Sequence, residues 1–202
     1  MFLFALLISL ASASPAPAST ANPTTSPGPV ASAPANPWDE CLDSKALPYD
    51  HPLELKLRAL DGPDFDLLQY RGKAVLLNIF ATWCGPCNKE MPALVTAAQT
   101  YASRGLQVVS IDSRESDDAV RAFRKKYGIT TPIAMDQNGG FTRALEVGAQ
   151  ARGPVEYPVT LFIDPAGYLY CVREGEMDDA QLTYRVEHFL TANAKELATP
   201  SP

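Results

Sequence analysis

The stretch that decides the fold is ATWCGPC at residues 81–87, which places two cysteines three positions apart. The motif begins at the last residue of an apolar run, residues 74–81 (AVLLNIFA). Such runs are typical of strands that are buried on both faces. In residues 91–98 apolar side chains recur at three- and four-residue spacing, which indicates a helix. We therefore expect Cys84 where a buried strand ends and a helix begins.

That position suits a reactive thiol. The first turn of a helix has unpaired N–H groups and carries the positive end of the helix dipole, and both stabilise a thiolate at Cys84. Cys87 follows one turn later on the same helix face, close enough to form a disulfide with Cys84. The pair is predicted to be a redox-active dithiol.

The cysteine pair has two other possible roles, a zinc site and a pair of core residues. Half of a zinc site has the same spacing, but His51 and His188 are isolated, and neither Cys41 nor Cys171 has a Cys or His neighbour. We therefore expect no metal site. A pair of buried core cysteines leaves the intervening Gly-Pro and the preceding Trp83 without an explanation.

Composition limits the classes of function. The chain has 202 residues, enough for one domain, with a net charge of −6 and no basic cluster, which argues against a nucleic-acid partner. Residues 1–13 hold a short apolar block followed by small residues, which is typical of a secretory signal, although no Lys or Arg precedes the block. We expect the protein to be exported to the periplasm. The N-terminal segment is then either removed by cleavage or kept as a membrane tether.

The remaining domain boundaries follow from composition. Residues 14–37 are rich in Pro, Ala, Ser and Thr and carry no charge, which predicts a disordered linker. The folded domain is expected at residues 38–194, and residues 195–202 are expected to be a flexible tail.

Within the domain, alternation and apolar runs predict an α/β protein with helices on both faces of one sheet. Strands are expected at residues 53–59, 65–68, 74–81, 106–111, 133–135, 159–163 and 168–172. Helices are expected after Cys84 to about residue 103 and at residues 116–127, 141–147 and 178–192.

Together these features resemble the thioredoxin fold, and more narrowly the TlpA/ResA group of exported thiol–disulfide oxidoreductases. The motifs that carry the resemblance are YRGK at residues 70–73, NIFATWCGPCNKEMP at 78–92 and YPVTLFID at 157–164. The resemblance covers residues 50–192. It implies a three-layer sandwich around a mixed sheet, with an N-terminal β-hairpin extension and one inserted helix near residues 141–147.

The resemblance also implies roles for single residues. Cys84 is expected to be the attacking thiolate and Cys87 the resolving thiol. Pro158 matches the cis-proline that faces the cysteines in this fold. Glu90, three residues after Cys87, matches the acidic residue that accepts a proton from the resolving thiol; the alternative is an ordinary solvated helix glutamate.

Three further positions bear on the site. Trp83 precedes Cys84 and Tyr157 precedes the expected cis-proline Pro158, so we expect Trp83, Tyr157 and Pro158 to contact substrate. Asn78 stands where thioredoxin has a buried aspartate, and an amide cannot take a proton. If the reaction needs a carboxylate, Glu90 is the candidate.

The function implied is an exported reductase that reduces disulfides of partner proteins, in the maturation of apocytochrome c or copper-site proteins. The expected partners are disulfide-bearing proteins and a membrane thiol electron donor, the protein is expected to be a monomer, and no cofactor beyond the Cys84–Cys87 disulfide is expected. Two alternatives stay open: a thiol peroxidase, whose chemistry uses a lone cysteine after a different loop, and a Cu(I)-binding or delivery protein.

The other two cysteines lie far apart in sequence, at Cys41 and Cys171. In an exported chain two further cysteines are expected to pair, and a self-closing Cys84–Cys87 leaves only Cys41–Cys171. The alternative is that Cys171 is a small core residue and Cys41 a free thiol.

Overall fold

A computed structural model describes residues 51–148 and 156–198, and every structural statement below concerns these residues. The predicted signal, the linker and Cys41 lie outside them. Within the described part, no helix is long and apolar enough to cross a membrane.

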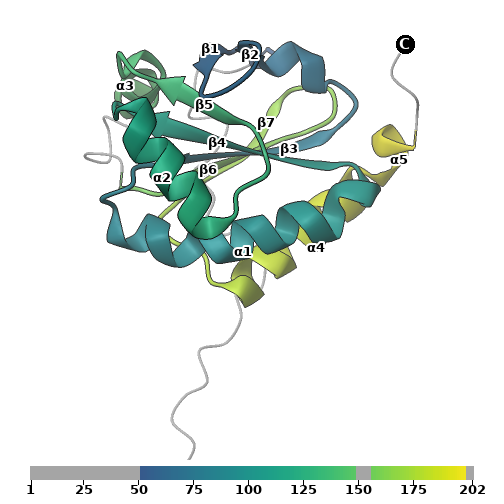
Figure 1. Ribbon diagram of the computed structural model, residues 1–202. Coiled ribbons are helices and arrows are strands. Elements are labelled where there is room, and N and C mark those ends of the chain that lie inside the picture. The colour runs from purple at the N-terminus through teal and green to yellow at the C-terminus, as the bar shows by residue number, and fades with distance from the viewer. Residues whose placement is uncertain (1–50, 149–155, 199–202) are drawn as a thin grey trace, which may run out of the picture. The chain divides into compact units, whose positions relative to one another are not determined.

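The described residues form one seven-stranded sheet with helices packed on both of its faces (Figure 1). The strands are β1 (Lys56–Ala59), β2 (Phe65–Asp66), β3 (Ala74–Phe80), β4 (Leu106–Ser113), β5 (Ile133–Asp136), β6 (Val159–Ile163) and β7 (Leu169–Glu174). The α-helices are α1 (Gly85–Tyr101), α2 (Asp117–Tyr127), α3 (Gly140–Gly148), α4 (Asp179–Ala192) and α5 (Ala194–Leu197). Two short 3-10 helices, η2 (Leu67–Tyr70) and η3 (Ala102–Arg104), complete the order.

The sheet is mixed, and its order is β2-β1-β5-β4-β3-β6-β7. β3 runs parallel to β4, and β4 runs parallel to β5. β6 is antiparallel to β3, and β7 and the β1–β2 hairpin add antiparallel edges. Every residue of β3 is buried, as its unbroken apolar run predicts. The predicted α/β class with a mixed sheet and an N-terminal hairpin is confirmed.

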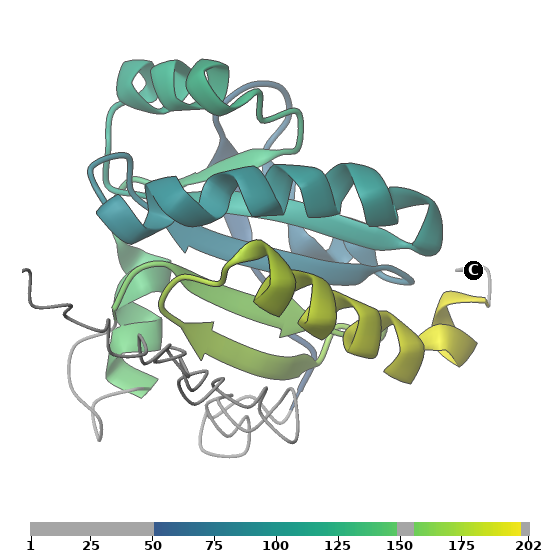
Figure 2. The same ribbon diagram turned by 90° about the horizontal axis from the view of Figure 1, so that it is seen from below.

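The helices divide between the two faces of the sheet (Figures 1 and 2). On one face α1, α2 and α4 pack around Leu76, Phe80 and Phe162, and Phe162 meets Phe189 of α4 edge-on with ring centroids 5.4 Å apart. On the other face Leu145 of α3 and Leu67 of η2 pack against Leu77 and Ile79 of β3 and their neighbours.

Several element bounds differ from the expectations. The strand expected at residues 53–59 begins only at Lys56, and the strands expected to end at residues 111, 135 and 172 end at Ser113, Asp136 and Glu174. The second strand of the hairpin stops at Asp66, because the Asp66 carboxylate accepts the Leu68 N–H at 3.0 Å and so caps the 3-10 helix η2. Beyond residue 194, where the folded domain was expected to end, the chain continues into α5. There the Leu197 side chain lies over Gly105, so closely that a Cβ on Gly105 would come within 2.9 Å of it.

The YRGK motif fixes the turn between β6 and β7 to the start of β3. The Arg71 guanidinium lies directly over Gly167, where a Cβ atom would stand 1.6 Å from a guanidinium nitrogen. Gly167 also has a φ of +95°, which favours glycine. The Gly72 N–H donates to the Pro165 carbonyl at 2.9 Å. Only glycine at 167 satisfies both the backbone and the space.

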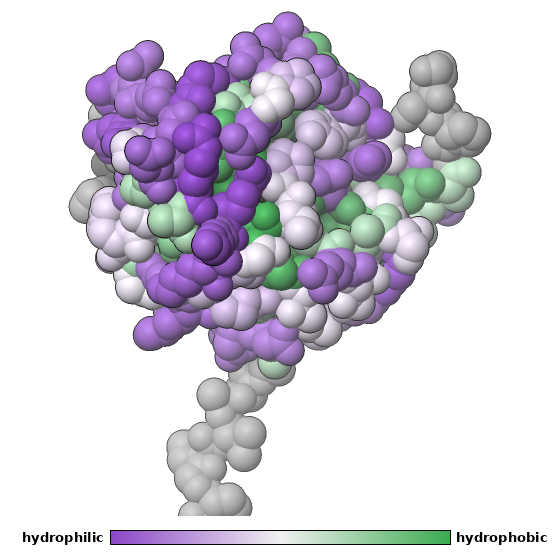
Figure 3. All heavy atoms as spheres, in the orientation of Figure 1, coloured by the Kyte–Doolittle hydropathy of each residue, from purple (hydrophilic) through white to green (hydrophobic). Residues whose placement is uncertain are grey.

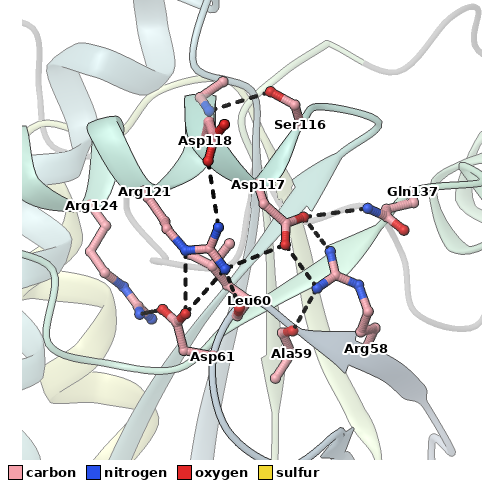
Figure 4. A network of polar contacts seen from close by, with 11 residues as sticks. Arg58, Ala59, Leu60, Asp61, Ser116, Asp117, Asp118, Arg121, Arg124 and Gln137 are labelled. Carbon is pink, nitrogen blue, oxygen red and sulfur yellow. Dashed lines mark hydrogen bonds and ion pairs between the residues drawn. The ribbon is translucent and has the colours of Figure 1, made fainter.

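A network of charged side chains joins the hairpin to α2 (Figure 4). Arg58 of β1 makes a two-pronged contact with the Asp117 carboxylate. Arg121 contacts Asp117 and Asp61, and Arg124 reaches Asp61 at 2.5 Å. The outer face of α2 is correspondingly hydrophilic (Figure 3). The network ties β1, which lies between β2 and β5 in the sheet, to α2, which follows β4 in the chain.

This network makes a testable prediction. Asp117→Asn should lower the melting temperature more than Asp118→Asn, because Asp117 pairs with Arg58 and Arg121 whereas Asp118, 99% exposed, reaches only Arg121. Both residues occupy the first turn of α2, so both substitutions lose the same helix-dipole interaction. The difference should shrink in high salt.

The stabilisation that Asp117 contributes depends on pH in one direction only. The Arg58 guanidinium holds the pKa of Asp117 below its usual value of 3.8. The stabilisation is therefore complete above that pH and is lost as the pH falls through the lowered pKa. Equal melting temperatures of the two variants at low salt and neutral pH would contradict this account.

Candidate active site

The cysteine pair lies where the sequence places it, at the junction of β3 and α1. Cys84 is the N-cap of α1, with extended backbone angles, and its Sγ accepts the Cys87 N–H at 3.1 Å. The two sulfurs form a disulfide with Cα atoms 5.3 Å apart. Cys84 is 5% exposed and Cys87 is 1% exposed, so Cys84 is the more accessible of the two cysteines to a partner. When the bond is reduced, the same N–H stabilises a thiolate on Cys84.

Asn88 holds the loop before the helix. Its side-chain N–H groups donate to the carbonyls of Thr82 at 2.9 Å and Cys84 at 2.7 Å. Its side-chain oxygen accepts from the Tyr127 hydroxyl at 2.6 Å and from Lys126 at 3.0 Å. The turn that presents Cys84 is therefore anchored to the end of α2.

Glu90 is buried, 1% exposed, on the helix face of Cys87 and one turn deeper. Its two oxygens accept from the Met177 backbone N–H at 3.0 Å and from the Asn78 side chain at 2.9 Å. Asn78 also donates to Thr160 at 3.0 Å. The alternative of a solvated helix glutamate does not describe this residue.

Burial raises the pKa of Glu90 from 4.5 to about 7, although its hydrogen bonds from Met177 and Asn78 act in the opposite direction. The carboxyl group therefore changes protonation near neutral pH, where it can take up or release a proton beneath the cysteines. Asn78 supports it as a donor and does not titrate, as the amide side chain requires.

The surface around Cys84 is aromatic. Trp83 is 71% exposed, and its ring meets Tyr157 edge-on with centroids 6.4 Å apart. The Tyr157–Pro158 peptide bond is cis, the conformation that the resemblance implies. The Tyr157 hydroxyl lies 3.1 Å from the Ser113 hydroxyl at the end of β4. Trp83, Tyr157 and Pro158 thus stand in the places expected of substrate-binding residues, and that role stays a prediction.

Two acidic residues near the site, Asp112 and Glu115, were not predicted from the sequence to belong to it. The Glu115 carboxylate accepts the Thr82 backbone N–H at 2.5 Å and the Thr82 hydroxyl at 2.6 Å. Asp112 is 0% exposed, and its Oδ1 accepts the Glu115 N–H at 3.0 Å. The only sequence signal was their place after the strand of residues 106–111, which runs parallel to the strand before Cys84.

The remaining predicted site is the structural disulfide. Cys171 is buried on β7, opposite Phe162 of β6. Cys41 lies outside the described residues, so the Cys41–Cys171 bond stays a prediction. Among the described residues, no cluster of three or more His, Cys, Asp or Glu side chains is arranged to hold a metal ion.

Comparisons with known proteins agree with this geometry. Residues 50–171 match the model of the AhpC/TSA family. The chain is 32% identical over 123 residues to the thiol-disulfide oxidoreductase ResA of Bacillus thuringiensis subsp. konkukian, covering 61% of this chain and 67% of that protein. It is 30% identical over 131 residues to ResA of Geobacillus thermodenitrificans, covering 65% and 71%.

Solved structures show the same fold. A thioredoxin-family thiol:disulfide interchange protein from Chlorobium tepidum superposes with a TM-score of 0.61 at 31% identity, covering 69% of this chain and 97% of that one. A secreted disulfide oxidoreductase of Mycobacterium tuberculosis, 23% identical, superposes with a TM-score of 0.57 over 73% of this chain and 99% of its own. The chain belongs to the AhpC/TSA family, and its fold, its disulfide and its relatives make it a ResA-like thiol–disulfide oxidoreductase.

Proposed function

We propose that the protein is a reductase that works outside the cytoplasm and opens disulfide bonds in partner proteins. The observation that carries the proposal is the placement of Cys84 at the N-cap of α1, with a buried, titratable Glu90 beneath its partner Cys87. The Gly-Pro pair between the cysteines resembles the reducing members of the fold. The location outside the cytoplasm is supported by the apolar N-terminal segment of the sequence.

The reaction begins from the reduced dithiol. The Cys84 thiolate attacks one sulfur of the partner's disulfide, so that a bond forms between Cys84 and that sulfur and the partner's own S–S bond breaks. The other partner sulfur leaves as a thiolate and takes a proton from water. The result is a mixed disulfide between the protein and its partner.

Cys87 then completes the exchange. Its thiol gives a proton to Glu90, and the thiolate attacks Cys84, which forms the Cys84–Cys87 disulfide and releases the second partner sulfur. Two electrons have passed from the dithiol to the partner. A membrane thiol electron donor is proposed to return the Cys84–Cys87 disulfide to the dithiol.

The proposed substrates are oxidised apocytochrome c and copper-site proteins that carry two neighbouring cysteines. Trp83, next to Cys84, and Tyr157, next to the cis-proline, lie against each other and offer aromatic surface to an extended peptide. An oxidised Cys-x-x-Cys-His peptide is the simplest probe of the cytochrome class, because that sequence attaches haem.

The roles of the cysteines are tested by two substitutions. Cys84→Ser should abolish reduction of the oxidised Cys-x-x-Cys-His peptide and of insulin disulfides, since the attacking thiolate is lost. Cys87→Ser should accumulate a covalent mixed disulfide, because nothing resolves it. Mass spectrometry of the reaction mixture measures both outcomes. If Cys87 proved the faster of the two to react with iodoacetamide, the assignment would be reversed.

The same preparations separate the competing functions. A peroxide turnover faster than disulfide reduction would favour the thiol peroxidase. Tight stoichiometric Cu(I) binding without disulfide reduction would favour the copper-delivery protein. The proposed reductase predicts reduction of both disulfide probes and slow peroxide turnover.

Glu90 makes a separate prediction. Glu90→Gln should slow the resolving step by about a hundredfold, the lower end of the usual contribution of a general base. In the unsubstituted protein the rate of resolution should rise as the pH passes about 7, where Glu90 becomes a carboxylate. In the variant that rise should move upward toward about 8.5, the ordinary pKa of a thiol.

The matched control is Glu187→Gln, which removes an exposed carboxylate of α4 paired with Arg104. Stopped-flow decay of a preformed mixed disulfide between pH 5 and 9 measures the step. Identical profiles for Glu90→Gln and Glu187→Gln would reduce Glu90 to a structural residue.

A further inference from the structure

A second buried acid, Asp112, lies near the active-site loop. Asp112 is 0% exposed near the end of β4, beside Phe80, the last residue of β3. Thr82, two residues after Phe80, begins the turn into Cys84. The mechanism above gives Asp112 no role.

The loop that follows β4 reaches the site through Glu115. Both Glu115 oxygens accept from Thr82, one from its backbone N–H and one from its hydroxyl. A group that accepts through both oxygens acts as a carboxylate. These two bonds therefore fix the residue that precedes Trp83 and Cys84.

The backbone of this loop is shaped for that contact. Arg114 has a φ of 68°, in the left-handed region that residues other than glycine rarely adopt. Its side chain lies over Gly139, where a Cβ would come within 2.8 Å of it. The turn at Arg114 separates Ser113, which meets Tyr157, from Glu115, which meets Thr82. One loop thus contacts both Tyr157, before the cis-proline, and Thr82, before Trp83 and Cys84.

The charged side chains that act on Asp112 are Glu115 and Asp136 of β5. Asp136 uses both oxygens to accept from the start of α3, one from the Phe141 N–H and the other from the Thr142 N–H and hydroxyl. Glu115 uses both oxygens for Thr82. Asp112 uses only Oδ1; its Oδ2 is buried and has no hydrogen-bond partner among the described residues.

Of the three carboxyl groups, Asp112 is thus the one with an oxygen left to carry a proton. We propose that Asp112 is a positioning residue for the reaction: it keeps its proton, donates it in a hydrogen bond to the Glu115 carboxylate, and so holds Glu115, Thr82 and the Cys84 loop in place. The catalytic part of this inference rests on the proposed function.

The electrostatics agree with this assignment. Burial, with the neighbouring Glu115 side chain and Asp136 adding to it, raises the pKa of Asp112 from 3.8 to about 8. At pH 7 the group is therefore mostly neutral in the folded protein. Above about pH 8 a buried charge on Asp112 would lie beside Glu115 and Asp136, and the Glu115–Thr82 contact should weaken.

The test follows the Thr82 backbone amide by NMR in the oxidised protein, where Cys84 and Cys87 do not titrate. Between pH 6 and 9.5 the Thr82 and Glu115 amide resonances should shift together, with one inflection near pH 8. Asp112→Asn keeps the shape and a donor N–H, and should remove the inflection. The control Glu187→Gln should keep it.

Kinetics supply a second readout. Glu115→Gln should slow the attack by Cys84 on the oxidised peptide by about tenfold, the effect of losing one hydrogen bond to a charged group. In the unsubstituted protein the rate of attack should fall between pH 7 and 9 as Asp112 ionises, and Asp112→Asn should remove that fall, because the amide cannot ionise. Far-UV circular dichroism checks that both variants are folded.

The inference is overturned if the Thr82 resonance of the unsubstituted protein is flat from pH 6 to 9.5, a result that needs no variant. It is also overturned if Asp112→Asn keeps the inflection. The NMR titration uses no partner protein. A protein that titrates as expected but reduces no disulfide would contradict the proposed function and leave the positioning of Thr82 standing.

Discussion

The structure depends on one constraint: a reactive sulfur must sit at the end of a fully buried strand and the start of a helix. The burial of β3 on both faces fixes its direction and register, since each residue is enclosed by neighbours. Cys84 then occupies the N-cap of α1, where the helix supplies N–H groups to a thiolate. Every other feature of the site either holds this junction or serves the chemistry at it.

Two buried acids support the junction from different directions. Glu90 lies beneath Cys87, and hydrogen bonds from Asn78 and Met177 hold it there. Asp112 lies behind Glu115, which holds Thr82. Both acids have raised pKa values because they are buried, so each binds a proton more tightly in the folded protein than in the unfolded chain. Their contribution to stability is therefore greatest at low pH and is lost as the pH rises to about 7 and about 8 respectively.

The sequence allowed most of the fold to be predicted, because the decisive signals are local. β6 (Val159–Ile163) was predicted to the residue. α2 and α4 begin one residue after the predicted starts, because Ser116 and Asp178 are their N-caps. α5 was not expected, because it is a single turn whose anchor is the distant contact of Leu197 with Gly105. Short helices of this kind depend on tertiary packing, which local sequence patterns do not predict.

The residues of the site likewise fall into those that local spacing predicts and those that depend on distant contacts. Cys84, Cys87 and Glu90 share one helix, so their spacing alone brings them to one face. The hydrogen bond that Glu90 accepts from the Met177 N–H spans 87 residues, and the contact of Glu115 with Thr82 spans 33 residues, so neither could be read from local spacing. Asp112 was left outside the predicted strand of residues 106–111, because an aspartate at a strand end normally faces water. Only the register of β4 against β3 shows that it is enclosed.

The central claim is that the dithiol supplies electrons to partner disulfides, and the reduction potential of the Cys84–Cys87 couple tests it most directly. The protein is equilibrated with mixtures of reduced and oxidised dithiothreitol, and the alkylated fraction of Cys84 and Cys87 is counted by mass spectrometry. The account predicts a potential near the roughly −270 mV of thioredoxin, or lower. A potential near about −120 mV, typical of a strong dithiol oxidant, would contradict it.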